Sequence, residues 1–205
     1  MIDLKGRKGR ARFYFKHGRK KGFIKNNIRR ALQIRVEYLT FARLLRPRFT
    51  KIIFPQANNM EFPAALKQLI HQPQNVAILS HRNPDGDAIG SSLAMRHYLD
   101  QYGHTVHVLF PSEFPEEFEA LPGADDILVW DIHTEECKHV LRNKNLFIYL
   151  DFNALNRIDK MGDFVKDLPG KRIMLDHHLY PDQIADFTYS EPEASSTCEL
   201  VYRFI

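Results

Sequence analysis

One imidazole and two carboxylates fall within seven residues of this 205-residue chain, at His81, Asp85 and Asp87. The apolar run at 75–80 has the composition of a buried strand, and the segment 91–102 has helical periodicity. The three side chains are therefore predicted to follow the carboxyl end of a strand, where open α/β sheets bind ligands. Imidazole and carboxylate groups in this spacing indicate a divalent-metal site.

Three other interpretations of this segment compete with the metal site: a solvated turn, a calcium loop and a phosphate-binding glycine loop. Residues 84–87 have ordinary turn composition, so a solvated turn is the plain alternative. A calcium loop counted from Asp85 requires ligands where Ile89 and Arg96 stand, so that loop is excluded. The glycines match neither a dinucleotide-binding loop nor a P-loop. The turn and the metal site remain.

Two later segments repeat the pattern of an apolar strand that ends in an Asp or His residue. Asp151 follows the apolar run 146–150, and the run 172–176 leads into the tripeptide Asp176-His177-His178. A single acidic residue after a strand is ordinarily a helix cap, and a His pair is ordinarily exposed or a satisfied core group. Three strands ending this way in one chain favour a shared metal site.

These residues closely resemble the motifs of the DHH phosphoesterase superfamily, whose name is the tripeptide at 176–178. The resemblance covers about residues 62–205 and implies an α/β fold with a mainly parallel sheet flanked by helices. The P-D-G-D-A-I-G-S form of the first motif, the D-F-N-x-x-x-R segment from Asp151 to Arg157, and the hydroxyl run 195–197 before a helix are informative. They most resemble the bifunctional oligoribonuclease and 3′-phosphoadenosine 5′-phosphate (pAp) phosphatase branch.

The resemblance implies two bound ions. The first ion would be held by His81, Asp85 and Asp151, and the second by Asp87, Asp151, His177 and one further Asp. Asp151 would thus bridge the ions. The family generally uses Mn²⁺, which suits these ligand types, although Mg²⁺, Fe and Zn²⁺ stay open. Two such cations lower the pKa of a shared water and clamp the entering and leaving oxygens of an in-line displacement.

Other residues are expected to act on the substrate. By the same resemblance, His178 would face the substrate phosphate and Asp176 would orient a ligand imidazole. Arg157 and the amides of a helix opening at Ser91 could stabilise phosphoryl charge. Arg157 is equally consistent with a surface ion pair, and Ser91 and Ser92 are predicted to be helix caps rather than ligands.

The implied function is Mn²⁺-dependent hydrolysis of short oligoribonucleotides and of pAp. Within enzymes, the alternatives are a pyrophosphatase, a single-strand exonuclease or a cyclic-dinucleotide phosphodiesterase. In another class, the alternative is an inactive nucleic-acid or nucleotide-binding fragment. This last possibility arises because the family's fourth Asp motif and its C-terminal substrate-binding domain would follow Ile205. Residues 60–205 are thus expected to be a partial DHH domain, one ligand short.

Residues 1–59 differ sharply in charge from the remainder. They hold 17 Lys and Arg against 2 acidic residues, a formal +15, while the remainder holds 12 against 23, a formal −11. This asymmetry favours a nonspecific nucleic-acid-binding arm, and 27–45 could form a basic amphipathic helix. Alternatively, translation starts at Met60, before an expected helix at 61–70. A secretory signal and a transit peptide are not expected, because no apolar run follows the basic start and the first serine is Ser80.

The rest of the chain sets simple bounds. Cys137 and Cys198 match no metal or redox spacing, which fits a reducing cytoplasm and structural roles. No apolar run is long enough to span a membrane, and a homodimer stays open. His104 and His107 lie outside the motifs and are expected to be structural or exposed. The predicted strands are 75–80, 105–110, 146–150, 172–176 and 186–190.

Overall fold

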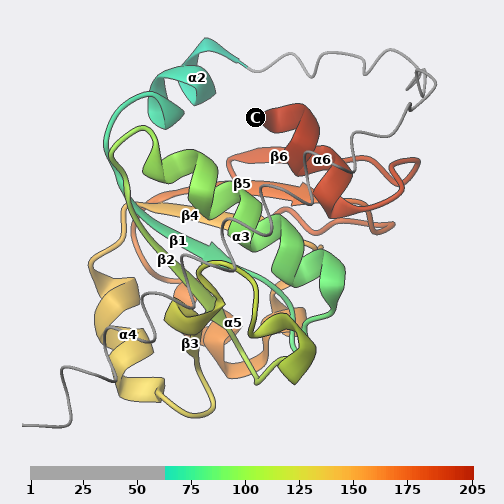
Figure 1. The fold of residues 1–205 in the computed structure, drawn as a ribbon. Helices are drawn as coiled ribbons and strands as arrows, with labels where there is room; N and C mark the ends of the chain where they lie inside the picture. Colours follow the sequence, from blue (N-terminus) through green and yellow to red (C-terminus); the bar gives the residue numbers. More distant parts are fainter. Residues whose placement is uncertain (1–62) are drawn as a thin grey trace, which may run out of the picture. The chain divides into compact units, whose positions relative to one another are not determined.

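The computed structural model describes residues 63–205, which form a six-stranded parallel sheet in the order β3-β2-β1-β4-β5-β6 (Figure 1). The strands are β1 (Asn75–Leu79), β2 (Thr105–Phe110), β3 (Leu128–Val129), β4 (Leu146–Leu150), β5 (Lys171–Asp176) and β6 (Phe187–Ser190). The predicted parallel α/β sheet and its five strands are confirmed. The two-residue β3 was not predicted, because so short a strand has no periodicity.

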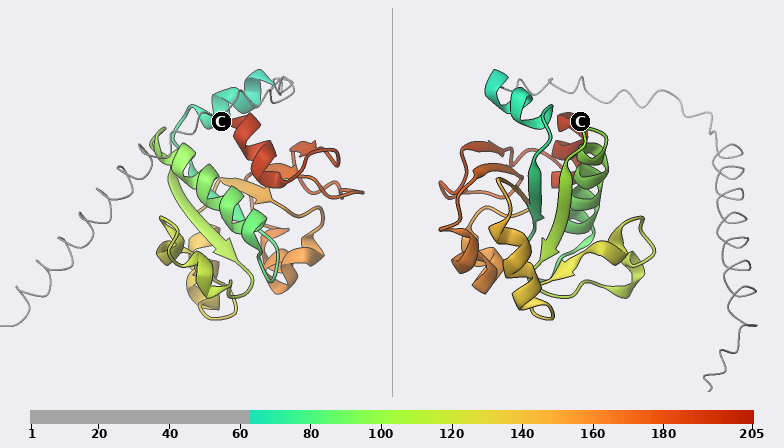
Figure 2. Two further views of the ribbon diagram at one scale, coloured as in Figure 1. Left: turned by 45° about the vertical axis from the view of Figure 1, so that its right-hand side comes forward. Right: turned by 90° about the vertical axis from the view of Figure 1, so that its left-hand side faces the viewer.

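Helices cover both faces of this sheet. They are α2 (Ala64–Ile70), α3 (Gly86–Asp100), α4 (Thr134–Arg142), α5 (Asp159–Val165) and α6 (Thr197–Phe204). α3 and α6 pack on one face and α4 and α5 on the other, which gives three layers (Figure 2). The helix predicted at 61–70 is found as α2.

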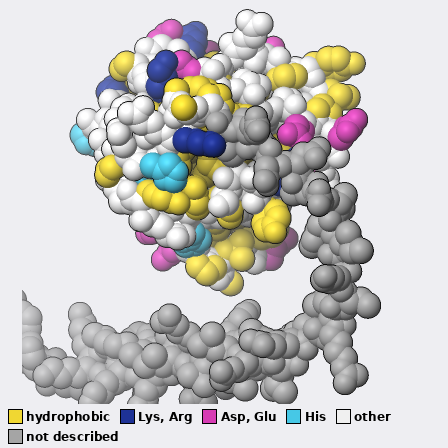
Figure 3. Space-filling model, turned by 90° about the horizontal axis from the view of Figure 1, so that it is seen from above, with side chains coloured by type: hydrophobic (Ala, Val, Ile, Leu, Met, Phe, Trp, Pro, Cys, Tyr) yellow, Lys and Arg dark blue, Asp and Glu magenta, His cyan; other side chains and the backbone are white. Residues whose placement is uncertain are grey.

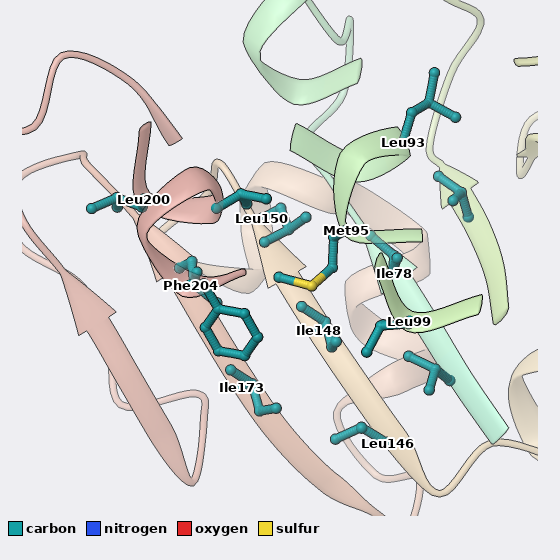
Figure 4. Close-up of a cluster of buried hydrophobic side chains, with 14 of the residues drawn as sticks. Ile78, Leu93, Met95, Leu99, Leu146, Ile148, Leu150, Ile173, Leu200 and Phe204 are labelled. Carbon is teal, nitrogen blue, oxygen red and sulfur yellow. The ribbon is translucent and has the colours of Figure 1, made fainter. Parts of the chain in front are cut away.

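The central strands are buried on both sides, as parallel strands between two helix layers must be. In β1, Ile78 faces the cluster under α3 and α6, whereas Leu79 faces the cluster under α4 and α5. Figure 4 shows Ile78 and Ile148 near Met95 of α3, and Ile173 of the next strand near Phe204 of α6. Each such side chain contributes about 1.5–3 kcal/mol by leaving water, so the sheet is a rigid platform for the loops at its edge.

The helix after the first motif begins earlier than expected. It was predicted to start at Ser91, but α3 starts at Gly86, because the side chain of Asp85 accepts hydrogen bonds from the amides of the first turn. Ser91 and Ser92 are therefore buried in the middle of α3 and are not caps. The prediction that amides at Ser91 face the phosphate is wrong for the same reason.

The strand order explains why the motifs meet. From β1 the chain moves outward through β2 to β3, whereas β4, β5 and β6 extend the other edge. A crevice opens outside the carboxyl ends of the strands where the order reverses, and ligands bind there in such sheets. β1, β4 and β5 are adjacent, and their ends lead into His81, Asp151 and His177.

The predictions for residues 1–59, for a helix at 27–45 and for a start at Met60 lie outside the described residues. Within 63–205, no helix is long and apolar enough to cross a membrane. Figure 3 views the molecule from the side of α2, where hydrophobic side chains lie among a few Lys and His. A cavity of about 300 Å³ lies on the α2, α3 and α6 side, lined by Leu66, Lys67, Ile70, His71, Tyr98 and Phe204.

Candidate metal centre

His81 is held with one ring nitrogen directed at two carboxylates. Its Nδ1 donates to the carbonyl oxygen of Arg82 at 2.8 Å, so Nε2 carries the free lone pair. Nε2 lies 3.4 Å from Asp151 Oδ2 and 3.9 Å from Asp85 Oδ1. Burial opposes protonation of this imidazole, but the contacts with Asp151 and the Arg82 carbonyl outweigh it and raise the His81 pKa. The ring is thus placed as a ligand or as a partner of anions.

The loop that carries His81 is fixed through its neighbour Arg82. The amide of Arg82 donates to the carbonyl oxygen of Arg157 at 2.9 Å, and its guanidinium pairs with Asp131 at 2.9 Å and with Asp159. A cavity of about 530 Å³ lies on this side of the loop, with Arg82, Asp131 and Asp159 in its lining. Of the loop's residues Arg82, and not His81, lines this cavity.

Asp85 is oriented by the start of α3. Its Oδ1 accepts from the amide of Asp87 at 3.0 Å and from that of Ala88 at 3.1 Å. Partial burial would raise the Asp85 pKa, but these amides and the nearby His81 lower it overall. The carboxylate is consequently ionised at neutral pH, and its Oδ2 is not used by the helix cap.

Asp151 stands between two imidazoles. Its side chain is buried, and Oδ2 faces His81 Nε2 at 3.4 Å while Oδ1 faces His177 Nε2 at 3.6 Å. The backbone there has φ 65°, a left-handed conformation that costs an Asp about 1 kcal/mol or more. Strain of this kind is common where function fixes a side chain. The predicted bridging position of Asp151 is consistent with this geometry.

Asp87 and His177 form the opposite side of the centre. Asp87 Oδ2 lies 3.7 Å from His177 Nε2. The same carboxylate accepts from the amide of Thr197 at 2.8 Å and from that of Cys198 at 2.7 Å. Asp87 therefore joins the first turn of α3 to the first turn of α6 while it faces the imidazole.

His178 is oriented by the buried carboxylate of Asp176. Its Nδ1 donates to Asp176 Oδ1 at 2.7 Å, and its amide donates to Asp176 Oδ2 at 3.0 Å. Since a carboxylate only accepts, Nδ1 carries the proton and Nε2 is left for another partner. Asp176 was expected to orient a metal-ligand imidazole. It bonds His178 and makes no hydrogen bond to His177.

The donor atoms are arranged as a cation requires. Two groups have candidate ligand atoms that all lie within 4.8 Å of one another, namely His81 with Asp85 and Asp151, and Asp151 with His177 and His178. The His178 nitrogen nearest Asp151 is the Nδ1 that donates to Asp176, so His178 is not counted as a ligand. Atoms bound to one ion at about 2.1 Å are about 3.0–3.5 Å apart, near the contacts seen here. Mixed carboxylate and imidazole donors fit Mn²⁺ and similar divalent ions. These side chains therefore fit the expected metal.

Arg157 is the one predicted site residue that the structure does not bring to this cluster. It lies in the short 3₁₀ helix η3 (Leu155–Ile158) and is exposed. Its guanidinium makes no hydrogen bond or ion pair to any residue within 63–205. Its role at the phosphate stays a prediction.

Thr197 is a site residue that sequence reasoning missed. Its hydroxyl donates to Asp151 Oδ1 at 2.9 Å, and both side chains are buried. The hydroxyl run at 195–197 predicted the start of a helix. It gave no indication of which hydroxyl would turn inward toward the centre.

Both cysteines are free and neither is activated. Burial is the main cause that raises the pKa of Cys137 to about 11, and burial together with Asp87 raises that of Cys198 to about 12. The thiols stay protonated at neutral pH, so they are neither nucleophiles nor ready metal ligands. This agrees with the structural role expected for them.

Residues 75–205 match the DHH family, N-terminal domain, and the chain therefore belongs to the DHH family. The solved structure of an exopolyphosphatase-related protein from Bacteroides fragilis is similar, with 44% identity and a TM-score of 0.67 over 69% of this chain and 42% of that chain. The cyclic-di-AMP phosphodiesterases PdeA of Listeria monocytogenes and GdpP of Bacillus subtilis are 25% and 24% identical over 154 and 147 residues. The chain spans about a fifth of their length, 22% in each case, and these alignments cover 67% of it.

Proposed function

We propose that this domain hydrolyses phosphoester bonds of short oligoribonucleotides and of pAp with two divalent ions, Mn²⁺ first among them. The observation that carries this proposal is the division of the Asp151 carboxylate between two imidazoles, with Oδ2 toward His81 and Oδ1 toward His177. A buried carboxylate that faces one imidazole with each oxygen is suited to bridge two cations.

The chemistry divides between the ions and the protein. When bound, paired divalent ions lower the pKa of a water and offset the charge on the phosphate. The protein holds the ligands in place: the Arg82 carbonyl fixes the tautomer of His81, and the α3 cap fixes Asp85. A nucleophilic side chain is not required.

His178 is assigned to the substrate phosphate. Asp176 accepts from its Nδ1–H, so in the imidazolium form Nε2–H can donate a hydrogen bond or a proton to a phosphoryl oxygen. The His178 side chain is partly exposed, whereas Asp176 is fully buried. A fixed donor that faces developing negative charge is among the strongest contributions that a protein makes to such a reaction.

The choice of substrate rests on the form of the motifs. The P-D-G-D-A-I-G-S segment and the Asp151-to-Arg157 segment resemble the oligoribonuclease and pAp phosphatase branch. Arg157 is exposed and its guanidinium has no hydrogen-bond or ion-pair partner in 63–205, so it is available to a substrate phosphate. Cyclic-dinucleotide hydrolysis is the second candidate, favoured by the names of the relatives PdeA and GdpP.

The test is a substrate panel with the full chain and Mn²⁺. It compares a triribonucleotide, pAp, cyclic-di-AMP and inorganic pyrophosphate, with chelated enzyme and Asp151→Asn as controls. We expect Mn²⁺-dependent release of mononucleotides from the RNA and of phosphate from pAp. Preferential cleavage of cyclic-di-AMP would move the assignment to the second candidate. Binding of Mn²⁺ without hydrolysis of any of the four would refute the proposal.

A further inference from the structure

The first turn of α6 contacts two carboxylates of the centre at once. The amides of Thr197 and Cys198 donate to Asp87, and the Thr197 hydroxyl donates to Asp151. These partners are far apart in the sequence, so only the folded sheet brings them together. Asp87 and Asp151 also lie 3.7 and 3.6 Å from the same nitrogen of His177.

The Thr197 hydroxyl is not needed to cap the helix. Ser196 is the N-cap, because its Oγ accepts from the amide of Glu199 at 3.1 Å. The Glu199 carboxylate in turn accepts from the amide and hydroxyl of Ser195, both at 2.8 Å. This reciprocal pattern is a variant of the capping box. It leaves the Thr197 hydroxyl free for Asp151, away from the helix end.

We propose that Thr197 is a positioning residue of the metal centre. Its hydroxyl restrains the rotation of the Asp151 carboxylate, so that Oδ1 is directed at His177 while Oδ2 is directed at His81. Hydrogen bonds to a metal-binding carboxylate orient it and tune its affinity. The inference rests on the proposed function only in that it assumes that ions bind here.

The surroundings make this contact effective. Thr197 is fully buried and Asp151 is 2% exposed, so water cannot replace the hydroxyl. A hydrogen bond to an ionised group in such surroundings is about twice as strong as one between neutral groups. The branched Thr side chain also has few rotamers, which keeps the hydroxyl on the Asp151 side.

The experiment measures Mn²⁺ binding by calorimetry with the full chain. Thr197→Val removes the hydroxyl and keeps the shape, Thr197→Ser keeps the hydroxyl, and Ser196→Ala removes the neighbouring helix cap without touching Asp151. We expect Thr197→Val to weaken Mn²⁺ binding about 10–100-fold, and Thr197→Ser to stay within about threefold of the original chain. Ser196→Ala should lower the Tm in EDTA yet leave Mn²⁺ affinity within the same margin.

The possible results separate the inference from the proposed function. If the original chain binds Mn²⁺ and Thr197→Val binds it with the same affinity, the role of Thr197 is overturned while the metal centre is retained. Failure of the original chain to bind Mn²⁺ would overturn both. Should Thr197→Val not fold, Thr197→Ala also lacks the hydroxyl without adding bulk, and its Mn²⁺ affinity decides in the same way.

Discussion

Two histidines at opposite ends of the sheet are equally buried but differ in what their nitrogens face. His81, after β1, is 7% exposed, and so is His104, just before β2. His104 is fully bonded, because Nδ1 accepts from the amide of Gln74 at 3.0 Å and Nε2 donates to the carbonyl of Ile70 at 2.7 Å. His81 has one such bond, and its other nitrogen faces carboxylates. The site histidine is thus distinguished by a ring nitrogen that faces carboxylates and makes no backbone hydrogen bond, and not by its burial.

The charged groups at the two ends repeat this contrast. At the amino end, the ammonium of buried Lys144 lies 2.8 Å from His107 Nδ1 and 3.4 Å from the carbonyl of Thr105, and it makes no ion pair within 63–205. At the carboxyl end, Asp151 and its neighbours bring several anionic groups to one point. The carboxyl end therefore brings together groups that can bind a cation, whereas the amino end contains the ammonium of Lys144 without an ion-pair partner in 63–205.

His104, whose two ring nitrogens are both hydrogen-bonded, has the structural role expected for it.

The strongest test of the contrast is Asp151→Asn. The amide cannot offer an anionic oxygen to either side, so we expect no measurable Mn²⁺ binding at either position and no hydrolysis. The measurement is Mn²⁺ titration followed by calorimetry. Lys144→Met, at the other end, is the control and should bind as the original chain does. Full Mn²⁺ binding by Asp151→Asn would remove this carboxylate from the centre.

The next largest effect is expected from His178→Ala. The His178 imidazole is expected to stabilise the negative charge that develops on the phosphoryl oxygens during the reaction. Its loss should therefore lower the hydrolysis rate by about two to four orders of magnitude. Metal affinity should be nearly unchanged, since Asp151, Asp85 and His81 are untouched. Stopped-time assays with pAp, with Mn²⁺ binding measured in parallel, check both parts. An active His178→Ala enzyme would contradict the assignment.

The two buried histidines can be exchanged for alanine in a matched pair. His81→Ala should weaken Mn²⁺ binding by at least about 10–100-fold and cost little stability in EDTA. His104→Ala should leave Mn²⁺ binding intact but cost about 2–3 kcal/mol of unfolding free energy, because the Gln74 amide and Ile70 carbonyl lose their partner. Urea denaturation in EDTA gives the stability of each. Equal losses of Mn²⁺ affinity in both variants would contradict the distinction between a metal-site His81 and a structural His104.

The smallest predicted effect is a pH dependence due to Lys144. Burial lowers its pKa from 10.5 to about 8, so the unfolded chain binds more protons than the folded one between these values. The unfolding free energy should therefore rise with pH across this window, by on the order of 2 kcal/mol from about pH 8 to about pH 10. The difference between the original chain and Lys144→Met, measured by urea denaturation, isolates this contribution. A difference independent of pH would show that Lys144 is not desolvated.

Much of the fold could be predicted from the sequence because its strands are continuous apolar runs. Doubly buried parallel strands such as 146–150 have no polar alternation, and they stand out without an alignment. α4 and α5 were not predicted, because helices of 9 and 7 residues are shorter than the window of about 11–18 residues over which helical periodicity is recognised. The start of α3 expected at Ser91 was wrong because the Asp85 side chain, a candidate ligand, also caps the helix at Gly86.

The meeting of the motif side chains could be predicted because parallel strands deliver their carboxyl ends to one edge. That reasoning predicted that His81, Asp151 and His177 would meet, and the distances agree with it. The pairing of Asp176 with His178 and the Thr197 contact were not predictable, because rotamers and the packing of α6 decide them. Motif spacing carries no information about either.

The contact between Asp87 and α6 sets an order of events during synthesis. Asp87 and the Thr197 amide are 110 residues apart, so at about 5–20 residues per second the ribosome makes the second about 5–22 s after the first. Throughout that interval the nascent chain contains the His81 loop but not the helix turn that bonds Asp87. The hydrogen bonds between Asp87 and α6 can therefore form only after the first turn of α6 has been synthesised.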